Sequence, residues 1–217
     1  MEFRKSLVTY VLIVISACIF IYFALAVRSG EPLRFDQNVN SFLLSLFKEN
    51  SYPFFKALNL IGSSKGIGLI ALAVILLLWM KKRDYVGMAV FTLTIATGAL
   101  LNDYVKDTTA RPRPEIEHIV HVKSFSFPSG HAMMGVVLYV LIAYFLVSNI
   151  QSRAGKWLVM FLAILMIIML GVSRIVLQVH YPSDVVSGYA LGLAWVLMGL
   201  IIYEFLRKNG VNRINRK

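Results

Sequence analysis

The sequence predicts an all-α integral membrane protein, with six transmembrane helices and an interfacial amphipathic helix in the first outer loop. The first observation is composition: 58% of the 217 residues are hydrophobic, only 15% are charged, and the mean hydropathy is +0.71. Soluble domains are about half apolar and about a quarter charged, so this chain has more apolar surface than such a domain buries. The second observation is that the apolar residues fall into runs long enough to cross a bilayer.

Six apolar segments approach the length of about 20 residues that a spanning helix needs. They are 7–27, about 60–80, 85–101, 128–147, 157–172 and 185–206. Lys65 interrupts the second segment near its start, where a long side chain can reach the membrane surface. Arg4 and Lys5 precede the first segment as in a signal peptide, but signal sequences have apolar runs of about 7–15 residues. The longer run predicts a membrane anchor.

The distribution of Lys and Arg predicts the orientation in the membrane. Six spans place both ends of the chain on one side, which carries twelve of the 22 basic residues, three of them within 81–83. The other ten are spread through longer loops. Because basic residues in short loops favour the cytoplasm, both termini are expected to be cytoplasmic in a multi-pass protein of the cell membrane. Topology thus accounts for the net charge of +11, and no nucleic-acid partner is expected.

The loop between the first two spans contains apolar residues at a helical period. They are Phe35, Val39, Phe42, Leu43, Leu46 and Phe47. This period predicts an amphipathic helix that lies in the outer interface and either gates the entry of lipid or covers the site passively. No repeat or low-complexity segment divides the chain, so residues 1–217 are expected to form a single membrane-embedded domain.

Three polar segments lie at the outer ends of the last four spans, at 106–114, 128–131 and 173–184. The predicted topology places them on one side of the membrane, so they can converge on one site. The segments contain Lys106, Arg113 and Arg174, and the planar guanidinium fork of arginine matches phosphate oxygens. The sequence therefore predicts a site for a phosphorylated ligand.

The segment Pro-Ser-Gly-His at 128–131 adds an anion site of another kind. Pro128 suits the first turn of a helix, where its missing N–H has no helical partner. The exposed N–H groups near Ser129 and Gly130 would then bind an anion at the helix N-terminus. Gly130 also lets a ligand approach the backbone closely.

Two histidines accompany the cationic residues. If residues 180–184 turn helically, His180 and Asp184 share a face, and Asp184 could orient the ring of His180 as a nucleophile or base. His131 could give a proton to the leaving oxygen. Arg174 and His180 are six residues apart and would diverge by about 120° on a continuous helix. The helix must therefore end or bend before Pro182, or the two must approach the phosphate from different sides.

Together the three segments resemble the signature motifs of the type 2 phosphatidic-acid phosphatase superfamily, the lipid phosphate phosphatases. That family's pattern is Lys-x6-Arg-Pro, then Pro-Ser-Gly-His, then Ser-Arg-x5-His-x3-Asp. All eleven fixed positions match in order and spacing: Lys106, Arg113, Pro114, Pro128, Ser129, Gly130, His131, Ser173, Arg174, His180 and Asp184. In size and layout the chain is most similar to bacterial phosphatidylglycerophosphatase B-like enzymes.

The resemblance implies a hydrolase that works without a metal or other cofactor. His180 would attack phosphorus to give a phosphohistidine, Asp184 would orient His180, and His131 would protonate the leaving group. The phosphoryl oxygens would be bound by Lys106, Arg113, Ser129, Gly130 and Arg174. The implied partners are the bilayer and a membrane lipid phosphate, with no protein partner. Phosphatidylglycerol phosphate is the first candidate, and undecaprenyl diphosphate and phosphatidic acid are the alternatives.

Other functions stay open at this point. A phosphate-lipid transporter would need its site near the membrane midplane, whereas the charged residues here cluster at span ends. Phosphotransfer to an acceptor other than water would use the same histidines. Nothing in the three motifs contacts the rest of the lipid, so they do not rank the candidate substrates.

Several residues outside the motifs have two interpretations. A metal site could form from residues of the connecting segment, namely His118, His121, Glu115 and Glu117, although a solvated loop is the simpler interpretation. Arg111 and Lys123 either contact a headgroup or second phosphate, or are solvated. Gly188 and Gly192 form a small-x3-small pair, which predicts close helix packing and no chemistry.

Overall fold

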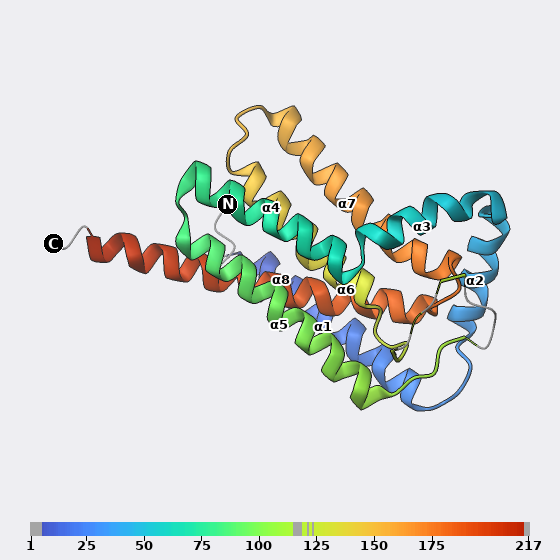
Figure 1. Ribbon diagram of the computed structural model, residues 1–217. Helices are drawn as coiled ribbons and strands as arrows, with labels where there is room; N and C mark the ends of the chain where they lie inside the picture. Colours follow the sequence, from blue (N-terminus) through green and yellow to red (C-terminus); the bar gives the residue numbers. More distant parts are fainter. Residues whose placement is uncertain (1–5, 115–118, 121, 123, 215–217) are drawn as a thin grey trace.

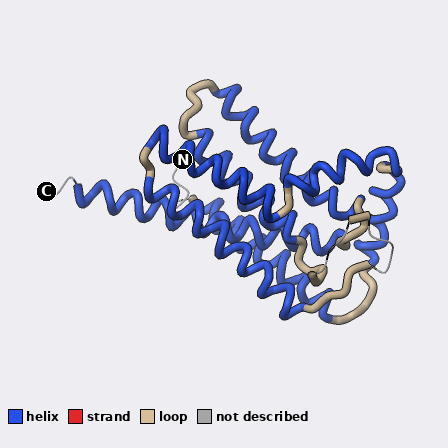
Figure 2. Tube along the Cα trace, in the orientation of Figure 1, coloured by secondary structure: helices blue, strands red, loops and turns tan. Residues whose placement is uncertain are grey.

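The computed structural model describes residues 6–114, 119–120, 122 and 124–214, and every regular element in this part is a helix. The elements are α1 (Leu7–Arg28), α2 (Arg34–Leu46), the short 3₁₀ helix η2 (Glu49–Ser51), α3 (Tyr52–Ile61), α4 (Ser64–Lys82), α5 (Tyr85–Thr109), α6 (Gly130–Val147), α7 (Arg153–Val176) and α8 (Pro182–Ile214). The first turns of α1 and the last turns of α8 lie toward one end of the bundle, and α2 lies at the other (Figure 1). The described non-helical residues between α5 and α6 also lie at that other end (Figure 2).

Five helices of the described chain are long and apolar enough to cross a membrane: α1, α5, α6, α7 and α8. A sixth candidate consists of Glu49–Ile61 and Ser64–Met80, a helix pair bent by 55°. The predicted second span at 60–80 is therefore wrong as a single helix. Ser63 explains the break, because its side chain accepts a hydrogen bond from the Gly66 N–H at 3.1 Å and caps a new helix there. The result is a multi-pass, all-helical membrane protein.

The centre of the bundle is formed by α6 and α8. α6 packs against α7 and α8, and α1 and α5 also pack on α8. A β-carbon at Gly188 would lie 2.6 Å from the Ser129 carbonyl oxygen, and one at Gly192 would lie 2.6 Å from that of Met133. The close packing predicted for the two glycines is confirmed, since the backbones of α6 and α8 are in direct contact.

Helix ends differ from the predicted span ends in a consistent way. α5 continues to Thr109 and α7 to Val176, so Lys106 and Arg174 each lie in the last turn of a spanning helix. The apolar runs marked the part of each helix that faces lipid or core, and the helices continue through polar residues until the chain turns. Two cationic side chains predicted to follow the spans are thereby fixed on helices.

α2 occupies the stretch for which an amphipathic helix was predicted. Phe42 and Leu46 on this helix are exposed, at 61% and 58% of their surface. Its one buried residue is Asp36, with 5% exposed. A carboxylate therefore faces the protein on the same side as the half-buried Leu43, while Phe42 and Leu46 face outward.

Candidate active site

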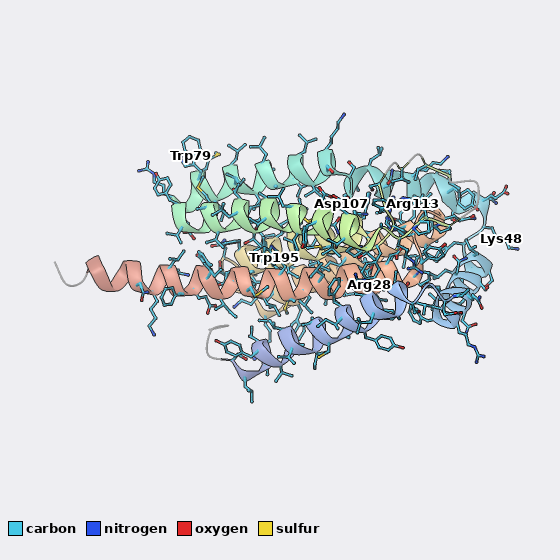
Figure 3. The ribbon with its side chains drawn as sticks, turned by 90° about the horizontal axis from the view of Figure 1, so that it is seen from below. Arg28, Lys48, Trp79, Asp107, Arg113 and Trp195 are labelled. Carbon is cyan, nitrogen blue, oxygen red and sulfur yellow. The ribbon has the colours of Figure 1, made fainter. Side chains whose placement is uncertain are left out.

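The three polar segments meet at the end of the bundle away from the chain termini. Figure 3 shows Arg113 toward the same end as Lys48, with Trp79 at the opposite end. A cavity of about 370 Å³ lies at this site. Six of the eight predicted site residues line it: Lys106, Arg113, Gly130, His131, Arg174 and His180. The other two, a serine and an aspartate, are fully buried outside its lining.

The turn between α7 and α8 brings His180 and Asp184 together. α7 has already ended when Gln178 adopts a φ of 59°, and the chain reverses before Pro182 starts α8. Nδ1 of His180 then lies 3.4 Å from Oδ2 of Asp184, so the expected contact is present, although His180 precedes α8 and the two residues do not share a helical face. The end of α7 also removes the 120° conflict, and Arg174 and His180 line the same cavity.

Three further donors hold the fully buried Asp184 carboxylate. Ser126 Oγ donates to Oδ2, and the Tyr181 N–H donates to the same oxygen at 2.9 Å. Arg111 donates to Oδ1 at 2.6 Å. A buried charge needs such partners, because otherwise its desolvation destabilises the fold. Arg111 also pairs with Asp36 at 2.9 Å, so the solvated interpretation of Arg111 is wrong.

The second ring nitrogen of His180 faces the cationic side chains. Nε2 lies 3.2 Å from a guanidinium nitrogen of Arg113. Because a guanidinium only donates, Nε2 accepts, and Nδ1 carries the hydrogen toward Asp184. Burial lowers the pKa of His180 from 6.5 to about 3; Asp184 opposes this shift, and Arg174 and Arg113 add to it. At neutral pH the ring is therefore neutral, and the electron pair of its Nε2 accepts from Arg113.

Lys106 and Arg174 keep donors available for a ligand, whereas each of the five N–H groups of Arg113 has an acceptor, one of which a phosphate would have to replace. Lys106 and Arg113 both donate to the Phe125 carbonyl, at 2.7 Å and 3.2 Å. Arg174, only 1% exposed, donates through Nη1 to Oδ1 of Asn59. Its Nε is buried and has no acceptor among the described residues. Leaving a buried charged donor unpaired is unfavourable, and a phosphate oxygen in the cavity would satisfy it.

His131 lies in the first turn of α6 and lines the cavity. Its Nε2 lies 3.2 Å from the backbone carbonyl oxygen of Asn59. A carbonyl only accepts, so Nε2 carries the hydrogen and Nδ1 is left for a ligand. Asn59, on α3, thus contacts His131 through its main chain and Arg174 through its side chain.

Two expectations for the segment 128–131 are wrong. Pro128 does not lie in the first turn of a helix, because α6 begins at Gly130 after Ser129 as the capping residue. The Ser129 N–H is not available to a ligand either, since it donates to the Asp184 backbone carbonyl at 2.9 Å. Ser129 Oγ is buried and lacks a partner in the described chain. The anion site at this helix terminus therefore depends on the N–H groups that begin at Gly130, which lines the cavity.

The metal site considered from the sequence falls on residues that the structure does not describe: His118, His121, Glu115 and Glu117. Lys123 also lies outside the described residues. Within the described ranges, no group of three His, Cys, Asp or Glu side chains is placed to hold a metal ion.

Sequence reasoning missed three residues that contact the site: Asp36, Asn59 and Ser126. A signal existed for Asp36, because it lies three residues before Val39 and seven before Leu43, on the apolar stripe of its helix. A carboxylate on such a stripe indicates a buried partner. Asn59 and Ser126 lie in segments without a comparable pattern, and only the tertiary structure brings them to the site.

The fold and the cavity define a class of protein: a helical multi-pass membrane protein whose helix ends enclose two histidines and three cations. The family model of the PAP2 superfamily matches residues 87–209, and the chain belongs to this superfamily.

Similar proteins with curated descriptions carry phosphatase names. Phosphatidylglycerophosphatase B of Bacillus subtilis (strain 168) is 41% identical over 102 residues, which cover 46% of this chain and 50% of that protein. Lipid A 1-phosphatase of Rhizobium etli is 30% identical over 130 residues, which cover 55% of this chain and 51% of that protein. The chain therefore spans about half the length of the curated relatives it matches.

Two solved structures share the fold over more of the chain. A crystal structure of a transmembrane PAP2-type phosphatidylglycerolphosphate phosphatase from Bacillus subtilis superposes with a TM-score of 0.75 and 25% identity. That match covers 85% of this chain and 93% of the other. The crystal structure of Aquifex aeolicus LpxE gives a TM-score of 0.61 at 19% identity, covers 78% of this chain and 97% of the other, and supports the fold alone.

Proposed function

We propose that this chain is a metal-independent lipid phosphate phosphatase that hydrolyses a phosphomonoester or diphosphate of a membrane lipid. The main support is the cavity in which Nε2 of His180 faces Arg113, with Lys106 and Arg174 on the same walls. Three cations there can neutralise the charge of a transferring phosphoryl group, a role that magnesium often has. The names of the relatives, phosphatidylglycerophosphatase B and lipid A 1-phosphatase, agree with a phosphorylated lipid substrate.

In the first chemical step, the Nε2 electron pair of His180 attacks phosphorus, and the bond between phosphorus and the lipid oxygen breaks. Asp184 holds the hydrogen on Nδ1 and stabilises the positive charge that develops on the ring. The leaving oxygen takes a proton from His131. Since Nε2 of His131 stays on the Asn59 carbonyl, the proton given is the one on Nδ1 of the protonated ring.

In the second step, water attacks the phosphohistidine. His131, now neutral, accepts a proton from this water through Nδ1. The phosphorus–nitrogen bond breaks, its electron pair returns to Nε2 of His180, and inorganic phosphate leaves. Throughout both steps Lys106, Arg113 and Arg174 bind the phosphoryl oxygens, together with the helix N-terminus at Gly130. Ser129 Oγ, buried without a described partner, is the remaining member of this predicted set.

The walls of the cavity support a lipid as the substrate. Beyond the charged residues they continue along apolar side chains of α4, α5 and α6, at Ile67, Ile95 and Met134. We place the lipid tails along this side and the phosphate at the charged end. In the corresponding topology the bent pair forms a sixth span, both termini are cytoplasmic, the site faces outward, and α2 lies in the outer interface. A midplane transport site is disfavoured, because the charged groups gather at one end of the bundle.

Phosphatidylglycerol phosphate is the substrate we favour, because two of the relatives described above are named for its hydrolysis. Undecaprenyl diphosphate and phosphatidic acid are the alternatives. Comparing kcat/KM on these three lipids with purified protein would rank them.

The proposal is tested by phosphate release from short-chain phosphatidylglycerol phosphate in detergent. His180→Ala should abolish release, and His131→Ala should slow it while the protein still becomes phosphorylated from labelled lipid. A chelator should leave the wild-type rate unchanged. Undiminished turnover by His180→Ala would show that His180 is not the nucleophile. Loss of activity with a chelator would show that the reaction depends on a metal ion.

A further inference from the structure

The carboxylate of Asp36 is bonded to the beginning of α8. Its Oδ1 accepts the Ser183 N–H at 2.7 Å, and its Oδ2 accepts the Ser183 hydroxyl at 2.7 Å. Pro182 is the first residue of α8, so this N–H belongs to the first turn, where a negative charge is favourable. A residue 147 positions earlier in the chain thus caps the helix that carries Asp184.

Arg111 connects this cap to the histidine pair. Its Nη2 binds Asp36 at 2.9 Å, and its Nη1 binds Oδ1 of Asp184 at 2.6 Å and the Ser183 hydroxyl at 2.8 Å. The guanidinium carbon lies 4.0 Å from the centre of the Tyr181 ring, which fixes its plane. With Oδ1 of Asp184 held by Arg111, Oδ2 is the oxygen turned toward Nδ1 of the catalytic histidine.

We propose that Asp36 and Arg111 are positioning residues for the reaction: Asp36 fixes Arg111, and Arg111 fixes the Asp184 carboxylate so that it orients His180. This inference rests on the proposed function. It assigns a role in catalysis to α2, which otherwise would only cover the site, and to an arginine outside the phosphate-binding set.

The bonding pattern requires an arginine at position 111. Two carboxylates and one hydroxyl accept from a single planar fork, which the ammonium of lysine cannot reproduce. The positive charge also offsets part of the Asp184 charge. The other groups that face His180 are Arg174 from α7, His131 from α6, Arg113 and Ser126 from the segment between α5 and α6, and Asp184 itself.

Steady-state kinetics on the lipid phosphate distinguish positioning from binding. Misplacement of a reacting group by about 1 Å can reduce the rate about 100-fold, so Arg111→Gln is expected to reduce kcat by about that factor with KM little changed. Asp36→Asn keeps one acceptor, for the Ser183 N–H, but its amide nitrogen cannot accept from Arg111 or from the Ser183 hydroxyl. Because Arg111 itself remains to hold Asp184, the loss of kcat should be smaller than in Arg111→Gln. If Asp36 acts only through Arg111, the double variant should be no worse than Arg111→Gln.

The pH profile separates charge from geometry. Arg111→Gln removes a positive charge near Asp184, so protonation of His180 becomes easier and the acid limb of kcat/KM moves to higher pH. Arg111→Lys keeps the charge and loses the planar fork, so its acid limb should stay at the wild-type pH while kcat stays low.

Asp84→Asn is the matched control. Asp84 caps α5 through the Gly87 N–H at 2.8 Å, accepts from Tyr203 at 2.6 Å, and does not line the cavity.

A spectroscopic measurement tests the inference without turnover. The chain has four histidines, so ¹⁵N-histidine spectra of the whole protein in micelles can be assigned with His180→Ala. The Nδ1–H signal of His180 should weaken or shift in Arg111→Gln and stay unchanged in Asp84→Asn. A lower kcat with an unmoved acid limb and an unchanged Nδ1–H signal would show a purely structural role and overturn the proposal. If the wild type hydrolyses no lipid phosphate, the proposed function fails, and this signal still decides whether Arg111 positions His180.

Discussion

Replacement of Arg174 by glutamine gives the sharpest test of the phosphate site. Arg174 is 1% exposed, one of its nitrogens is held by Asn59, and its Nε has no partner in the described chain. A hydrogen bond to a charged group is worth about 1.5–3 kcal/mol, which corresponds to about a 10- to 150-fold change in rate. Arg174→Gln removes both the hydrogen bond from Nε to the phosphate and a positive charge from the buried cavity, so kcat/KM should fall by about 100-fold.

The assay is phosphate release from short-chain phosphatidylglycerol phosphate in detergent, with thermal unfolding as a check on the fold. Arg153→Gln is the matched control, because Arg153 begins the same helix at its opposite end and is exposed. It should leave kcat/KM unchanged. If folded Arg174→Gln protein keeps the wild-type kcat/KM, Arg174 does not bind the phosphate and the assignment of the cavity is refuted.

Three further outcomes are expected. Gly192→Ala places a methyl group against a backbone carbonyl and should destabilise the protein by about 1–3 kcal/mol in thermal unfolding, whereas Gly68→Ala, with open space around it, should not; equal melting temperatures would contradict the packing. Because burial lowers the pKa of His180 from 6.5 to about 3, the acid limb of kcat/KM, corrected for ionisation of the substrate, should lie well below pH 6.5. A limb at 6.5 would mean that this ring is solvated. Asn59→Ala keeps the backbone acceptor of His131 but removes the side-chain acceptor of the Arg174 guanidinium, and this should lower kcat/KM by about 10-fold. Loss of all activity in this variant would show that Asn59 does more than hold Arg174.

The convergence of the three motifs was predictable, because each lies at the outer end of an apolar run and the runs have a length that a bilayer sets. The contact of His180 with Asp184 was predicted from their spacing, but the helical turn on which the prediction depended is absent, because α8 begins at Pro182. The ends of the helices were not predictable from the sequence. Hydropathy reports where a helix faces lipid, and α5 and α7 continue past that point for reasons of backbone hydrogen bonding.

Partners supplied by distant segments were the other part that the sequence did not predict. Arg111 has donors for several acceptors, and its neighbours in the chain do not indicate that Asp36 and Asp184 take them. Asn59 is an amide in an apolar segment, a position that suits a solvated helix end equally well. Only the tertiary structure decides which of these partners each residue has. One amino-acid sequence does not show which distant residues are in contact.

The direct backbone contact of α6 with α8 has a consequence for engineering. The Ser129 N–H is bonded to the Asp184 carbonyl, and Gly188 lies against Ser129. The start of α6, which carries His131, and the start of α8, next to His180, are therefore joined through their backbones. α4 lines the cavity at Ile67 and Gly68 and packs on α5 and α6, but none of its described residues is hydrogen-bonded to either histidine. Residues of α4 can therefore be varied to retune the choice of lipid while the reacting atoms keep their spacing, which makes this helix the place to begin a library of altered specificity.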